Sequence, residues 1–165
     1  MKRHHKGVPR KSKILLGAKV VAVSGYFDPL HSGHLNYIRE ARKLGDKLIV
    51  ILNNDKQAIL KKGYVFMPLK ERKKVLEGVK HVDEVFVSID KDRSVSKSLA
   101  KIKPDIFAVG ADNYKNHLVE KEVCDKLGIK IVDRLAKSLI KQSSSKIIKK
   151  FLNKIACCEC GGKVK

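Results

Sequence analysis

Two histidines, three residues apart, stand in a glycine-rich turn that follows an apolar run. The turn occupies residues 25–34 and reads Gly-Tyr-Phe-Asp-Pro-Leu-His-Ser-Gly-His. His31 and His34 are one helical turn apart, so both imidazoles face the same side of the chain. Imidazole N–H groups suit a phosphate that gains negative charge during a reaction. The alternative is that His31 only caps a helix and that His34 packs against the core or faces solvent.

The residues around the histidines predict a strand, a tight turn and then a helix. The apolar run is Val20 to Ser24, and Leu35, Ile38 and Ala41 recur at helical spacing after the turn. The first N–H groups of a helix are unpaired and carry the positive end of its dipole, so they attract phosphate. Gly33 has no side chain and lets a ligand come close to these groups.

The complete turn resembles the G-x-F-D-x-x-H-x-G-H signature of the cytidylyltransferase-like nucleotidyltransferases, and it matches every fixed position. The resemblance implies a Rossmann-like enzyme that transfers a nucleotidyl group from a nucleoside triphosphate to a phosphorylated substrate and releases pyrophosphate. It also implies that the turn's backbone and both imidazoles hold the α-phosphate. The nucleotide-binding residues predicted here are Tyr26, Phe27, His31, Ser32, Gly33 and His34.

A second helix with hydroxyl groups at its N-terminus is predicted near the end of the chain. Three serines and a lysine at 143–146 precede apolar residues at helical spacing up to Ile155. One serine would suffice for N-capping, but the triplet resembles a family motif whose hydroxyls hold the outer phosphates. Ile148 stands where one form of that motif has arginine, and Lys146 or Lys149 is the candidate substitute. The predicted phosphate-binding residues are Ser143, Ser144 and Ser145.

Three further segments are similar to family motifs. Lys61-Lys62-Gly63 resembles a lysine–glycine loop from which a lysine reaches the triphosphate, which implies a catalytic role for Lys62; two solvated lysines are the alternative. Pro68 to Arg72 matches the Pro-x-x-x-Arg segment, which makes Arg72 a candidate. Gly110-Ala111-Asp112 implies that Asp112 lies beside the nucleotide, unless this aspartate only caps a turn.

Apolar runs and helical patterns alternate along the chain. Besides Val20 to Ser24, strands are predicted at 48–52, 85–87, 106–109 and 129–132, and helices at 69–77, 95–102 and 118–127. This alternation predicts an α/β fold with a Rossmann-like, doubly wound parallel sheet of five strands in a single domain. Ligands of such sheets bind beyond the carboxyl ends of the strands, where the histidine turn, the 110–113 loop and the serines are expected.

Composition is consistent with one domain carrying a basic extension. The 165 residues are 43% apolar, enough to fill a core. We predict a basic, disordered tail at 1–18, a nucleotidyltransferase domain at 19–155 and a Cys/Gly/Lys tail at 156–165. The formal net charge of +20 attracts triphosphates, and equally RNA, DNA or anionic lipid. No stripe of alternating aromatic and basic residues is visible, so a nucleic-acid partner is not favoured.

Metal binding is expected through the nucleotide rather than through the cysteines. Cys157-x-x-Cys160 is like half of a zinc ribbon, but a tetrahedral site needs four ligands and the tail adds only Cys158. We therefore expect an exposed, redox-sensitive tail. The expected cofactor is Mg²⁺, held by the triphosphate. Asp28 is either an indirect partner of that ion or a residue that holds its own turn together.

Two features predict where the protein acts. No run of about 18 apolar residues is present, so no membrane span is expected, and the N-terminus lacks the apolar centre of a signal peptide. We therefore expect an intracellular, cytoplasmic protein, and we expect it to be a homodimer.

Subfamily resemblances suggest the substrates. Ala41 to Asp46 and Val109 to Asp112 look like heptose 1-phosphate adenylyltransferases and glycerol 3-phosphate cytidylyltransferases, whereas Lys103 to Ile106 looks like archaeal FAD synthetases. Aromatic residues are only 5% of the chain, and flavin pockets need aromatic walls. The first hypothesis is therefore transfer from ATP or CTP to a sugar or glycerol phosphate. The alternatives are FMN adenylyl transfer and, in another class, a basic nucleic-acid-binding protein. A flavin wall would use Tyr64, Phe66 and Tyr114.

Overall fold

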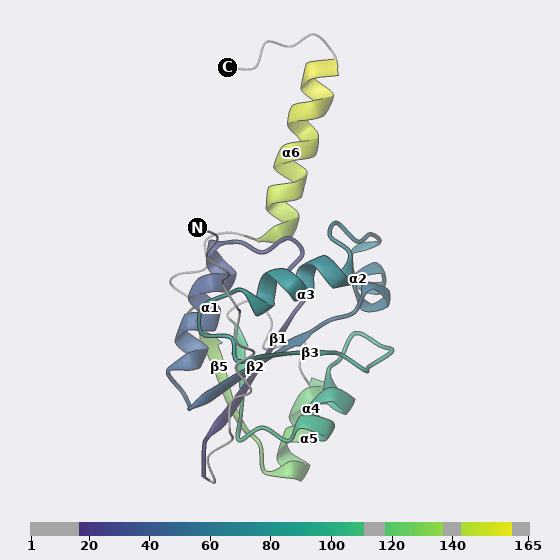
Figure 1. Ribbon diagram of the computed structural model, residues 1–165. Coiled ribbons are helices and arrows are strands. Elements are labelled where there is room, and N and C mark those ends of the chain that lie inside the picture. Colours follow the sequence, from purple (N-terminus) through teal and green to yellow (C-terminus); the bar gives the residue numbers. More distant parts are fainter. Residues whose placement is uncertain (1–16, 111–117, 137–142, 160–165) are drawn as a thin grey trace, which may run out of the picture.

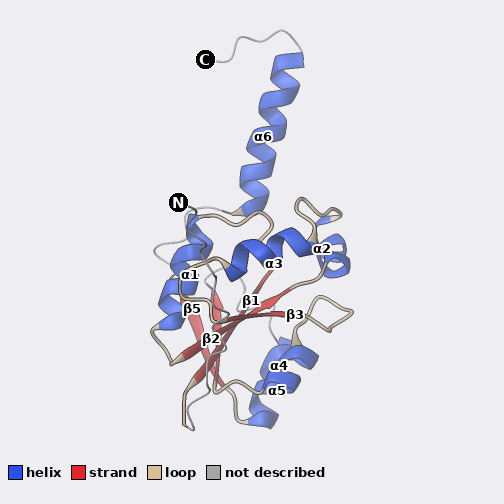
Figure 2. Ribbon diagram, viewed as in Figure 1, coloured by secondary structure: helices blue, strands red, loops and turns tan. Residues whose placement is uncertain are grey.

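A five-stranded parallel sheet forms the centre of the protein (Figure 1, Figure 2). The computed structural model describes residues 17–110, 118–136 and 143–159. The strands are β1 (Val20–Gly25), β2 (Lys47–Leu52), β3 (Glu84–Val87), β4 (Ile106–Gly110) and β5 (Lys130–Leu135). The helices are α1 (Ser32–Arg42), α2 (Asp55–Lys62), α3 (Leu69–Glu77), α4 (Ser96–Ile102), α5 (Leu118–Leu127) and α6 (Ser144–Glu159).

The strand order β3-β2-β1-β4-β5 confirms the predicted doubly wound sheet. Strand β1 lies in the middle and pairs in parallel with both β2 and β4, so Val23 lies opposite Val50 on one side and Ala108 on the other. The direction of winding reverses between β1 and β4. In open parallel sheets this reversal point is where ligands bind, at the carboxyl ends of the strands.

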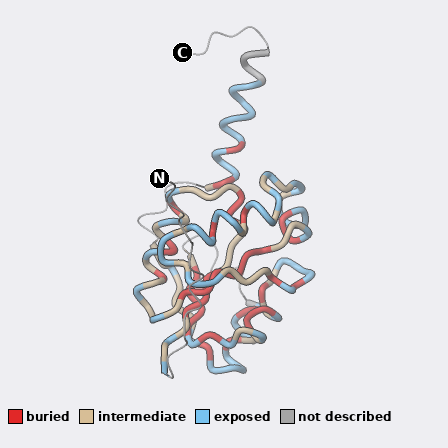
Figure 3. The backbone as a smooth tube through the Cα atoms, viewed as in Figure 1, coloured by how far each residue is buried: buried red, intermediate tan, exposed pale blue. Residues whose placement is uncertain are grey.

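Helices cover both faces of the sheet because successive side chains of each strand point to opposite faces. Val21 and Val23 of β1 pack in one core cluster with residues of α1 and α3, such as Ile38 and Leu76. Ala22 packs in the second cluster with residues of α4 and α5, such as Leu99. Figure 1 shows these two helix pairs on opposite sides of the strands, and Figure 3 shows the buried residues gathered between them.

The last helix, α6, extends away from the sheet and its flanking helices (Figure 1). It continues past Ile155, where the apolar pattern ended, to Glu159. Near its start Ile148 is buried, but Phe151, Leu152 and Ile155 further along are exposed, and Phe151 is 56% exposed. In the part of the chain that the structure describes, no helix is long and apolar enough to cross a membrane.

Other differences from the predicted elements are small. Lys61 and Lys62 are the last residues of α2 rather than part of a loop, because the helix runs on until Gly63 ends it in a left-handed conformation with a φ of 81°. Strand β5 is longer than predicted and ends at Leu135. The basic N-terminal tail up to residue 16, Asp112 and Cys160 lie outside the described residues.

Candidate active site

A cavity of about 650 Å³ lies at the carboxyl ends of the central strands. Its walls come from the ends of β1, β2 and β4, the start of α1, the end of α2, the loop between β3 and α4, the start of α5 and the N-terminus of α6. The lining residues predicted from sequence are Tyr26, Phe27, His31, Gly33, His34, Lys62, Ser143, Ser144 and Ser145. Residues from both ends of the sequence therefore meet at the switch point of the sheet.

The two histidines form a stacked pair at the N-terminus of α1. Their ring centroids are 3.7 Å apart, and the ring of Phe27 meets that of His34 edge-on at 4.8 Å. Nδ1 of His34 accepts a hydrogen bond from the backbone N–H of His31 at 3.3 Å. A neutral imidazole carries its proton on the other nitrogen when one nitrogen accepts. The Nε2–H of His34 is therefore available to donate a hydrogen bond.

The surroundings of the pair hold both rings in the neutral form. Burial, the neighbouring His31 and the charge of Lys62 lower the pKa of His34 to about 3. Burial and Lys62 also lower the pKa of His31. At pH 7 both rings are thus neutral, so each carries one N–H that can donate a hydrogen bond, and neither readily takes up a further proton. Nδ1 of His31 is buried and has no hydrogen-bond partner among the described residues.

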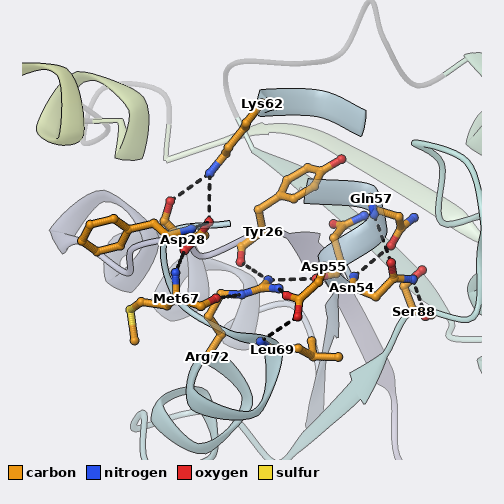
Figure 4. Close-up of polar contacts among 12 residues, drawn as sticks. Tyr26, Asp28, Asn54, Asp55, Gln57, Lys62, Met67, Leu69, Arg72 and Ser88 are labelled. Atoms are coloured by element: carbon orange, nitrogen blue, oxygen red, sulfur yellow. Dashed lines mark hydrogen bonds and ion pairs between the residues drawn. The ribbon is translucent and has the colours of Figure 1, made fainter. Parts of the chain in front are cut away.

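Asp28 is completely buried beneath the turn and does not line the cavity. Its two carboxylate oxygens accept hydrogen bonds from the backbone N–H groups of Phe66 and Met67, at 3.0 and 2.7 Å. Lys62 donates to the backbone carbonyl of Asp28 at 2.8 Å and lies 3.9 Å from its carboxylate (Figure 4). Burial lowers the pKa of Lys62, and Asp28 opposes that shift. Of the two predicted roles, the contacts favour holding the turn together.

Arg72 also lies beneath the turn, only 1% exposed, and does not reach the cavity. Its guanidinium donates to the backbone carbonyls of Tyr26, Asn53 and Met67, each at 2.8 Å. It also forms an ion pair with Asp55 at 2.5 Å (Figure 4). The structure thus makes Arg72 a positioning residue that joins the signature turn, the end of β2 and the segment before α3.

The serines connect the N-terminus of α6 to the signature turn. The hydroxyl of Ser144 donates to the backbone carbonyl of Pro29 at 2.9 Å. The hydroxyl of Ser143 accepts from the backbone N–H of Lys146 at 3.3 Å, which caps the helix. Two helix N-termini, those of α1 and α6, therefore border one cavity, and their dipoles add at any anion between them.

Several predicted residues stand apart from the cavity. Ser32 and Lys146 are exposed, and neither lines the cavity wall. Residues that the sequence reasoning missed are Asn53, Arg93 and Glu120, which do line it. The signal for Asn53 was present, because this residue directly follows β2 at the carboxyl edge of the sheet.

Among the described residues, no group of three acidic, histidine or cysteine side chains is placed to hold a metal ion.

Known proteins are similar in sequence to this chain. The FAD synthase of Ferroglobus placidus is 38% identical over 112 residues, which are 68% of this chain and 72% of that protein. The bifunctional protein HldE of Hahella chejuensis is 38% identical over 114 residues, or 68% of this chain but only 24% of HldE.

A solved structure and a family model agree with these relatives. The structure is the lipopolysaccharide core biosynthesis protein of Thermoplasma volcanium, which is 31% identical. It superposes with a TM-score of 0.64 over 72% of this chain and 97% of its own. The family model described as cytidylyltransferase-like matches residues 22–150, which include the signature turn and all three serines. The chain belongs to the cytidylyltransferase-like family and is a nucleotidyltransferase.

Proposed function

We propose that the protein transfers AMP or CMP from ATP or CTP to a small phosphorylated acceptor, a sugar phosphate or glycerol phosphate, and releases pyrophosphate. The observation that carries this proposal is the cluster of fixed donors in the cavity. His34, with Nε2–H as its donor, Lys62 and two helix N-termini all line a single cavity. This arrangement suits the triphosphate of a nucleotide.

The reaction needs no covalent enzyme intermediate. An oxygen of the acceptor phosphate attacks the α-phosphorus, and the bond from that phosphorus to the bridging oxygen breaks as pyrophosphate leaves. Neutral His31 and His34 would donate hydrogen bonds to the α-phosphate, where charge builds up in the transition state. Lys62 and the serine hydroxyls would hold the β- and γ-phosphates. The chain therefore contributes alignment and charge stabilisation.

Mg²⁺ is the proposed cofactor, and it would arrive with the nucleotide. When bound, it neutralises charge on the triphosphate and on the leaving pyrophosphate. The carboxylate of Asp28 is occupied by two backbone N–H groups. We therefore assign the ion to the phosphate oxygens, with Asp28 keeping the turn and Lys62 in place beneath them.

FMN adenylyl transfer is the second candidate function. The observation that favours it is the similarity to FAD synthases, one of which is matched over 72% of its own length. Among the described residues, the aromatic rings that reach the cavity are Tyr26, Phe27 and Tyr37. Phe27 and Tyr37 belong to the core, and Tyr64 and Phe66 do not line the wall. Tyr114, the third residue of the predicted flavin wall, lies outside the described residues. Among the residues that the structure describes, the tyrosine or phenylalanine ring left to contact a flavin is that of Tyr26, which supports the smaller acceptor.

A pyrophosphate-release screen tests the proposal and separates the two candidates. ATP and CTP are each paired with sugar phosphates, glycerol 3-phosphate, alcohol-amine phosphates and FMN, and products are identified by mass spectrometry. We expect release with a sugar or glycerol phosphate. Turnover of FMN and ATP alone would favour the second candidate. Pyrophosphate release from no pair would contradict the substrate class altogether.

A homodimer stays a prediction. Exposed apolar side chains on α6, among them Phe151 and Leu152, support an association surface on that helix. Light scattering coupled to size exclusion measures the mass in solution. Replacing Phe151 and Leu152 with serine would give a monomer if that surface is used.

A further inference from the structure

The cavity has a second half that the phosphates of a nucleotide would leave open. The histidines and serines lie on the side of α1 and α6, whereas Tyr26, Lys61 and the segment 92–95 line the side of β2 and β3. Lys62 lies between the two halves, since its charge acts on both histidines while its amino group is 5.6 Å from the centre of the Tyr26 ring. A second substrate in this half would therefore lie next to the α-phosphate.

The hydroxyl of Tyr26 points to a polar ligand in this half. Its oxygen is buried and has no hydrogen-bond partner among the described residues. Burial raises the pKa of Tyr26, so the phenol keeps its proton and can donate. Leaving a buried hydroxyl without a hydrogen-bond partner destabilises the protein. A ligand that accepts this hydrogen bond would recover that cost.

Two cations lie near the Tyr26 side chain. The amino group of Lys61 lies 4.9 Å from the centre of the Tyr26 ring. Arg93 lines the cavity from the loop after β3, and its charge, together with burial, lowers the pKa of Lys61. Within the described ranges, neither Lys61 nor Arg93 forms an ion pair with a carboxylate. The carboxylate of Glu120 lines the same cavity and accepts a hydrogen bond from the backbone N–H of Val95 at 3.1 Å. Two cations against one carboxylate leave this half of the cavity positive, which favours an anion.

The segment that carries Arg93 is held against the helix that carries Lys61. Gln57, a completely buried residue of α2, donates through its Nε2 to the backbone carbonyls of Asp92 and Ser94, at 2.7 and 2.8 Å. The two bonds bracket Arg93, so its backbone is fixed relative to Lys61, one turn further along α2. The pair of cations is thus built into the fold.

We propose that Lys61, Arg93 and the hydroxyl of Tyr26 bind the phosphate of the acceptor substrate. This assignment rests on the proposed function, because it supplies the attacking phosphate to the α-phosphorus held by the histidines. A phosphomonoester dianion matches two cations and one neutral donor, whereas an uncharged alcohol or amine would leave both cations uncompensated. The acceptor class is therefore a phosphomonoester, and Arg93 contributes to its selection.

Equilibrium binding tests this subsite without relying on turnover. The full chain is saturated with pyrophosphate and Mg²⁺ to fill the histidine half, and glycerol 3-phosphate, glucose 1-phosphate and FMN are then titrated by calorimetry. We expect at least one phosphomonoester to bind, and Lys61→Met and Arg93→Gln each to weaken it roughly tenfold or more. Tyr26→Phe should weaken it severalfold.

Two control variants each remove an exposed positive charge outside the cavity. Lys56→Met removes an exposed lysine of α2, and Arg39→Gln removes an exposed arginine of α1; neither side chain lines the cavity. Both variants should bind like the unmodified protein. Binding of no phosphomonoester, or binding by Lys61→Met and Arg93→Gln as tight as that of the unmodified protein, would overturn the subsite. Binding that depends on both cations, but without pyrophosphate release from any nucleotide, would retain the subsite and overturn the proposed reaction.

Discussion

The imidazole of His34 accepts the backbone N–H of His31 through Nδ1, at 3.3 Å. This bond does two things, because it satisfies an N–H at the start of α1 and fixes which ring nitrogen of His34 carries the proton. The same contact that begins the helix therefore leaves Nε2–H as the donor of a ring that lines the cavity. Capping, which the sequence analysis considered for His31, involves the side chain of His34 and is compatible with the proposed contact between His34 and the α-phosphate.

Replacing either histidine should lower turnover with little change in fold. We expect His31→Ala and His34→Ala each to reduce kcat by roughly 10²-fold or more, because each removes a donor that matters most in the transition state. His81→Asn, an exposed histidine in a left-handed conformation far from the cavity lining, is the matched control. Pyrophosphate release gives kcat, and circular dichroism checks folding. Near-normal kcat in both alanine variants would contradict the assigned roles.

The free energy of unfolding should fall as the pH is lowered below the pKa of a free histidine. In the folded protein the pKa of His34 is lowered to about 3, from 6.5. Between these two pH values the unfolded chain takes up a proton at His34 that the folded chain does not. The contribution of His34 to the free energy of unfolding is therefore fully present above pH 6.5 and declines toward pH 3. One such histidine contributes a slope of at most about 1.4 kcal/mol per pH unit. Urea denaturation at pH 7, 6, 5 and 4 measures how the free energy of unfolding changes with pH. The His34→Asn variant should show a smaller slope. Identical slopes in both proteins would refute this origin.

Removing the buried guanidinium of Arg72 should lower the free energy of unfolding, because Arg72 supports the signature turn. Arg72→Leu leaves three carbonyls and the Asp55 carboxylate without their donor, so we expect a loss of about 3–5 kcal/mol in the free energy of unfolding. Arg72→Lys should recover little, because an ammonium cannot reach all four acceptors. Arg39→Leu, at an exposed arginine, should change stability by less than about 0.5 kcal/mol. Denaturant titration compares the three, and equal losses would show that Arg72 has no special role.

The hydroxyl of Ser144 should matter more for nucleotide binding than for the fold. Ser144→Ala removes the bond to the Pro29 carbonyl and a donor at the α6 N-terminus, so we expect KM for the nucleotide to rise about tenfold. Ser96→Ala is a useful contrast, because the Ser96 hydroxyl is buried without a hydrogen-bond partner among the described residues. That variant should be neutral or slightly stabilising. Unchanged nucleotide KM in Ser144→Ala would remove this serine from the site.

The first thirteen residues should be dispensable for turnover. They carry lysine and arginine with little apolar content, so we expect their deletion to leave kcat nearly unchanged. The truncated protein is compared with the full chain at equal concentration in the pyrophosphate assay. A folded but inactive truncation would place this segment in the site.

The sheet was predictable from sequence because each strand is a local apolar run. Leu48 to Leu52 is apolar throughout and is completely or nearly completely buried, as expected for an inner strand of a parallel sheet. The histidine turn was equally local, since ten consecutive residues define it. Both therefore needed no knowledge of distant contacts.

Arg72 shows why other parts were not predictable. Its acceptors belong to three segments far apart in sequence, at Tyr26, Asn53 and Met67, and only the folded chain brings them together. Arg93 was missed for a similar reason, because its neighbour Lys61 is 32 positions away and its loop is held by Gln57. Local patterns predicted residues that line the cavity, whereas the supporting contacts depend on tertiary structure.

The separation of the cavity into two halves has a consequence for how such a protein diverges. The histidine turn follows the central strand β1, whereas Arg93 follows the edge strand β3. A lineage can therefore exchange residues of the edge loop, or lengthen it, without disturbing the buried centre of the sheet. Under the proposed assignment the edge loop supplies Arg93 to the acceptor while the buried turn keeps the histidines, so grafting the loop of a relative onto this chain is a rational route to a changed acceptor preference.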